Sequence, residues 1–63
     1  MSGVVQVRLE LSDEQAWVLA QFLKRATLDD YRGRAVDDHE AYAMIEAAEA
    51  VRRALAEAGY APR

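Results

Sequence analysis

The sequence predicts a small α+β protein, a β-α-α protomer with one N-terminal strand, two antiparallel helices and the strand paired across a dimer. Apolar and polar residues alternate strictly near the N-terminus, and two later segments repeat apolar residues at helical spacing. With 63 residues, the chain is long enough for one domain, 1–63. The expected elements are a strand over 4–11, a helix over 13–26, a loop over 27–36, a helix over 37–58 and a short tail over 59–63.

The predicted strand has one apolar and one polar face. The apolar face consists of Val5, Val7, Leu9 and Leu11, and the polar face of Gln6, Arg8 and Glu10. A strand without a neighbour leaves its backbone N–H and C=O groups unpaired, and no comparably strong second strand follows in the sequence. We therefore expect a homodimer joined through this strand, with a strand donated by a different protein as the alternative.

The first helix begins with a capping box, because Ser12 is followed three residues later by Gln15. Its apolar residues cover roughly 200° of the helix circumference, whereas a surface helix needs a stripe of about 100°. The excess predicts that a partner chain covers this helix in addition to the second helix. Trp17 and Phe22 are therefore assigned to the dimer interface, with helix-edge packing as the other role open to Trp17.

The connector and the second helix follow from glycine positions and from helical periodicity. Gly33 is expected to mark a turn, and whether residues 31–36 form a short extended piece is left open. The second helix is expected to begin at Asp37 or Asp38 and to end before Gly59, a typical C-terminal cap. Its apolar seam consists of Ala41, Met44, Ala48, Val51, Leu55 and Ala58.

Composition limits the stability and the location of the chain. Hydrophobic residues make up 52% of the sequence, but 13 of them are alanine, so large core side chains are few. The absence of cysteine excludes disulfides and thiolate metal sites, and such small domains often gain stability by oligomerisation. No apolar run approaches the roughly 20 residues of a membrane span, and no signal peptide is recognisable. We expect a cytoplasmic protein that does not contact membranes.

No motif in the sequence points to catalysis. The single histidine, His39, lies in an acidic run and has no second histidine or cysteine with which to bind a metal. The three glycines are scattered, so they form no phosphate-binding loop. We expect no enzyme activity, no catalytic residues, no metal and no cofactor.

The predicted order of strand, helix and helix resembles the ribbon-helix-helix family over residues 4–26. This resemblance implies that the paired strands enter the DNA major groove and that Gln6 and Arg8, with Glu10, read base edges. A DNA-binding transcriptional regulator is therefore one expected function. The acids at the start of the second helix and the net charge of −3 oppose contact with phosphates.

The chain is also similar in size, charge and lack of cysteine to small orphan proteins of phages and mobile elements, some of which are anti-CRISPR inhibitors. A cluster of acids around the connector fits this resemblance, because carboxylates compete with phosphates for lysine and arginine. Its members are Asp29, Asp30, Asp37, Asp38 and Glu40. The preferred expectation is a non-catalytic interaction module that inhibits or assists a nucleic-acid-handling complex, with a protein partner ahead of nucleic acid.

Overall fold

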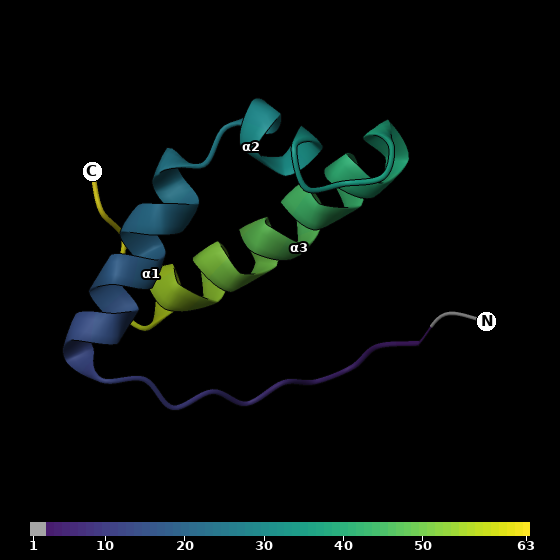
Figure 1. The fold of residues 1–63 in the computed structure, drawn as a ribbon. Coiled ribbons are helices and arrows are strands. Elements are labelled where there is room, and N and C mark those ends of the chain that lie inside the picture. The colour runs from purple at the N-terminus through teal and green to yellow at the C-terminus, as the bar shows by residue number, and fades with distance from the viewer. Residues whose placement is uncertain (1–2) are drawn as a thin grey trace.

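A computed structural model describes residues 3–63, and within this range the chain is all-helical (Figure 1). Helix α1 spans Asp13–Arg25, α2 spans Leu28–Arg32 and α3 spans Asp38–Glu57. Both shorter helices pack against α3, α1 near its C-terminal end and α2 near its N-terminal end. The N-terminal segment Gly3–Leu11 is extended and joins no helix, and its residues Val7, Leu9 and Leu11 border a groove that the C-terminal half of α3 also lines.

The predicted α+β class is therefore wrong, because the segment 4–11 is extended but is not a strand of a sheet. Within residues 3–63, no backbone hydrogen bond connects Gly3–Leu11 to another segment. A strand is defined by its ladder, and the part of the chain that the structure describes contains no second strand to complete one. We call Gly3–Leu11 the arm.

Helix α1 begins where the sequence predicts. The Ser12 hydroxyl accepts a hydrogen bond from the Gln15 backbone N–H at 3.0 Å, and the Ser12 N–H donates to Gln15 Oε1 at 3.0 Å. This reciprocal pair satisfies N–H groups that have no acceptor inside the helix. Asp13 and Glu14 in the first turn and Lys24 and Arg25 in the last turn complement the helix dipole.

Helix α2 lies inside the segment predicted as a loop, 27–36. Thr27 and Asp30 form a second capping box, in which the Thr27 N–H donates to Asp30 Oδ2 at 2.8 Å. The Thr27 hydroxyl accepts from the Asp30 N–H at 3.3 Å. Tyr31 and Arg32 are consequently helical, and the turn follows at Gly33.

Helix α3 ends in a Schellman motif that folds the chain back onto α1. Gly59 has φ +103°, its N–H donates to the Ala56 carbonyl at 3.0 Å, and the Tyr60 N–H donates to the Leu55 carbonyl at 2.8 Å. The reversal brings the Tyr60 ring to Trp17, edge to face with centroids 5.2 Å apart. The C-terminal tail thereby fastens α3 to α1.

The core of the described chain is small. Its buried hydrophobic residues are Ala16, Ala20, Ala41 and Leu55. Leu19, Leu23, Val51 and Tyr60 are half-buried around the cluster that Leu55 forms with the two alanines of α1. None of the helices described is long and apolar enough to cross a membrane. The small core means that the protomer is stabilised by helices that pack closely at alanine residues rather than by large buried side chains.

Candidate functional site

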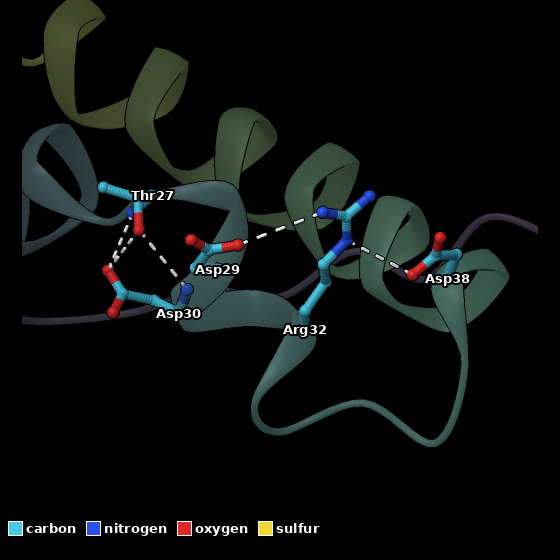
Figure 2. Close-up of polar contacts among 5 residues, drawn as sticks. All are labelled: Thr27, Asp29, Asp30, Arg32 and Asp38. Atoms are coloured by element: carbon cyan, nitrogen blue, oxygen red, sulfur yellow. Dashed lines mark hydrogen bonds and ion pairs between the residues drawn. The ribbon is translucent and has the colours of Figure 1, made fainter.

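The structure gathers the five predicted interaction acids around α2 and the first turn of α3. We call residues 29–40 the acidic end. Arg32 lies between two of these acids, with its Nη1 3.9 Å from Asp29 Oδ1 and its Nε 3.3 Å from Asp38 Oδ1 (Figure 2). The side chains of Asp29 and Asp38 remain 93% and 67% exposed. Their carboxylates therefore remain available to a partner, because surface ion pairs hold their members only weakly.

The other three acids cap helices. Asp37 Oδ1 accepts from the Glu40 N–H at 2.8 Å, and Glu40 Oε1 accepts from the Val36 N–H at 2.9 Å. Asp30 accepts from Thr27, whose backbone N–H and hydroxyl hold the pKa of the Asp30 carboxyl below its usual value. These three carboxylates are fixed in position by the backbone that they cap.

The acidic end accounts for the net charge of the whole chain. It contains five acids against Arg32 and Arg34, a difference of −3, which equals the formal net charge of −3 for all 63 residues. The remaining six acids are balanced by six basic residues. The sequence reveals this cluster, but the structure shows that the capping bonds position it and that Arg32 bridges it.

The acidic end has no arrangement typical of a catalytic or metal site. His39 is exposed in the first turn of α3. Among residues 3–63, no group of three or more histidine, cysteine, aspartate or glutamate side chains is placed to hold a metal ion. The chemistry available at this end is therefore charge-assisted hydrogen bonding by carboxylates.

A second candidate surface lies at the opposite end of α3, where the arm borders an apolar groove. The groove has a volume of about 330 Å³ and lies between the arm, α1 and the C-terminal half of α3. Val7, Leu9 and Leu11 line it from the arm, so three of the four residues of the predicted apolar face border the helices, and Val5 does not. The helical walls include Leu19, Val51, Ala54 and Ala58, which the sequence patterns place in helices but do not assign to a site.

The residues predicted for a dimer interface lie on two elements, the arm and helix α1. Val5, Val7 and Leu9 of the arm are 83%, 73% and 61% exposed, and Phe22 on α1 is 66% exposed. Trp17 instead has a partner within its own chain, because it packs against Tyr60. The interface role of all these residues stays a prediction.

Tyr60 is a contact that the sequence reasoning missed. Its hydroxyl donates to Asp13 Oδ1 at 2.5 Å, and this bond raises the pKa of the Tyr60 phenol because it favours the neutral form. A residue after a C-terminal glycine cap often packs on the last turn of its own helix, so the sequence marks Tyr60 as a packed residue but does not identify Trp17 and Asp13 as its neighbours. Tyr60 also lines the apolar groove, so the tail helps to shape that surface.

The residues predicted to read DNA bases lie on the arm but outside the groove. Gln6 and Arg8 are exposed, and neither lines the groove that Val7 and Leu9 border. The arm carries no ladder hydrogen bonds within the described chain, so it is not the paired ribbon that the resemblance to ribbon-helix-helix proteins implies. DNA binding by these two residues stays a prediction.

Comparison with known proteins gives one match. No curated protein and no solved structure is significantly similar to this chain. A family model described as a family of unknown function, DUF7706, matches residues 1–63, the full length of the sequence. The chain therefore belongs to the DUF7706 family.

Proposed function

We propose that this protein is a homodimeric, non-catalytic interaction module that uses its acidic end to contact a basic surface of a protein partner. The partner class proposed is a cytoplasmic nucleic-acid-handling complex, which the module inhibits or assists. The observation that carries the proposal is the concentration of the entire net charge of −3 within residues 29–40. Such a local field steers association with a basic partner and makes it sensitive to salt.

Preorganisation of the acidic end supports this proposal. Asp30, Asp37 and Glu40 are held by backbone hydrogen bonds of 2.8–2.9 Å, so they lose little conformational freedom on binding. Asp29 and Asp38 are exposed and can exchange Arg32 for a lysine or arginine of the partner. A basic surface that normally binds nucleic-acid phosphates presents the charges that this arrangement would pair.

The homodimer is supported by the imbalance between the buried core and the exposed apolar surface. Only one buried residue among those described, Leu55, is larger than alanine, whereas Val5, Val7 and Phe22 are more than 60% exposed. Chains of this size commonly need an additional source of stability beyond a single-chain core. Association between copies would bury apolar side chains that the protomer leaves in water.

The test is affinity capture from a native host lysate, followed by titration with the purified captured protein. The informative variant is Asp29→Asn combined with Asp38→Asn, because neither acid caps a helix through a backbone hydrogen bond. The matched control is Glu46→Gln with Glu57→Gln, which changes the net charge equally at exposed positions of α3 outside the acidic end. We expect salt-sensitive binding that the first pair weakens and the control pair retains.

Equal binding by both double variants would contradict the role of the acidic end. A gel-shift assay with double-stranded DNA provides the other decisive measurement. Salt-sensitive DNA binding that is lost in Arg8→Ala, with no protein partner captured, would replace the proposal by the DNA-binding regulator.

A further inference from the structure

We propose that a second copy of this chain packs on the face formed by the arm and the apolar groove. We call this the arm-groove face and define it by Val7, Leu9 and Leu11 of the arm with Leu19, Val51 and Ala54 of the helices. The inference rests on the proposed homodimer and deepens it, because it assigns the dimer to one surface.

The first reason is that the protomer does not cover this face by itself. The arm lies beside the groove, yet Val7 and Leu9 remain 73% and 61% exposed and Leu11 remains 40% exposed. The groove volume of about 330 Å³ is unfilled by any side chain of the described residues. Apolar side chains of a second copy would fill this space and cover the arm.

The second reason is the area that the face offers. From their exposed fractions, the three arm residues of this face, Val7, Leu9 and Leu11, expose roughly 300 Å², compared with about 800 Å² per partner in a standard interface. The groove walls on α1 and α3 lie next to them and add further apolar area to the face.

The third reason is charge, which favours a second copy at this face and disfavours it at the acidic end. Two acidic ends would repel each other, because each carries a net charge of −3. The arm contains one basic and one acidic residue, Arg8 and Glu10, and is therefore neutral. In a two-fold arrangement, the same patch meets itself, and the arm brings no net charge to that contact. A neutral, apolar surface suits a second copy better than a strongly charged partner.

The position of the face leaves the acidic end free. The groove walls on α3 are near its C-terminal end, whereas Asp38 begins the helix. Helix α3 has 20 residues, so its two ends are about 30 Å apart. A dimer formed through the arm-groove face would present two acidic ends, and a partner with two basic sites would bind it with increased avidity.

The test is the solution mass of full-length variants by size exclusion with light scattering. Leu9→Asp places a charge on the arm side of the face, and Ala54→Arg places one on the helical wall. The controls are Gln6→Asp on the arm and Ala56→Arg on α3, two exposed positions that do not line the groove. We expect twice the protomer mass of 7.1 kDa for the wild type and both controls. For Leu9→Asp and Ala54→Arg, we expect a dissociation constant raised at least about a hundredfold.

Circular dichroism distinguishes loss of association from general loss of fold. If folding depends on association, Leu9→Asp and Ala54→Arg should lose helical signal, whereas the two controls should keep it. The melting temperature of the wild type should then rise with protein concentration. This outcome also supports the proposal. A wild type that is dimeric together with dimeric face variants would overturn the assignment of the face and leave the homodimer standing. A wild type of protomer mass at high micromolar concentration would overturn both.

Discussion

Replacing Leu55 by alanine should remove a large part of the stability of this protein. Leu55 is 8% exposed and is the one buried residue larger than alanine among those described. Leucine-to-alanine changes in cores cost about 2–5 kcal/mol, depending on how well the site closes. Because Leu55 also lines the open groove, water can enter the vacated space, which places the expected cost at about 2–3 kcal/mol. A domain of 63 residues has a total stability of only about 3–9 kcal/mol.

The assay is urea unfolding followed by far-UV circular dichroism at one fixed protein concentration. With a slope of about 1 kcal/mol per molar urea, the midpoint should fall by about 2 M or more. The control is Val36→Ala, because Val36 is 86% exposed and its backbone bond to Glu40 survives the change. An unchanged midpoint for Leu55→Ala would show that the buried cluster around it does not hold the helices together.

Three further predictions concern the turns and caps. Gly59→Ala should lower the free energy of unfolding by about 1 kcal/mol and the melting temperature by several degrees, because Gly59 has φ +103°. The control Gly3→Ala should leave the melting temperature unchanged, because a Cβ at Gly3 meets no neighbouring atom. The pKa of Tyr60 is raised in the folded protein, so its hydrogen bond contributes fully to stability below the pKa of an unfolded tyrosine, about 10. This contribution to stability is lost as the pH rises through the pKa of Tyr60 in the folded protein. The urea midpoint should therefore fall less between pH values below and above 10 in Tyr60→Phe than in the wild type. If the midpoint falls equally with pH in both proteins, the bond to Asp13 is refuted. The pKa of Asp30 is lowered in the folded protein, so the capping bonds of its carboxylate stabilise the fold above about pH 4. This stabilisation is lost as the pH falls through the pKa of Asp30 in the folded protein. Thr27→Ala should lower the melting temperature, because it removes the hydroxyl from the capping box. Asp30→Asn has no carboxyl to protonate and should flatten the acid dependence in thermal scans from pH 5 to about pH 3; an unchanged acid slope would contradict the role of Asp30 in the cap.

Local signals predicted the start of α1 and the end of α3, because capping is a local interaction. The Ser12 and Gln15 pair marks the start of α1, and Gly59 marks the end of α3, where φ is positive. Thr27 and Asp30 have the same spacing of a capping pair, but we predicted a loop over 27–36 and therefore missed α2. Each of these features depends on residues within a few positions, so composition and spacing are sufficient to recognise it.

The candidate surfaces were predictable in part. The acids from Asp29 to Glu40 are neighbours in the sequence, so their concentration is visible without a fold. Their division into capping and exposed carboxylates is visible only in part, because the Thr27 and Asp30 spacing marks one capping pair, whereas the structure decides between Asp37 and Asp38 at the start of α3. The groove walls and the packing of Tyr60 on Trp17 bring together residues more than 40 positions apart, which no local pattern specifies.

The alternation of apolar and polar residues over 4–11 shows which features the sequence specifies and which depend on the tertiary structure. Alternation determined that the arm is extended and that Val7, Leu9 and Leu11 share one face, and these three residues do line one groove. Whether an extended segment is a strand depends on a ladder partner, which alternation does not supply and residues 3–63 do not contain. The sequence by itself determined the limits of α1 and α3, the placement of the acidic residues and the apolar face of the arm. The tertiary structure alone decided the fold class and the groove, because both depend on contacts between distant segments.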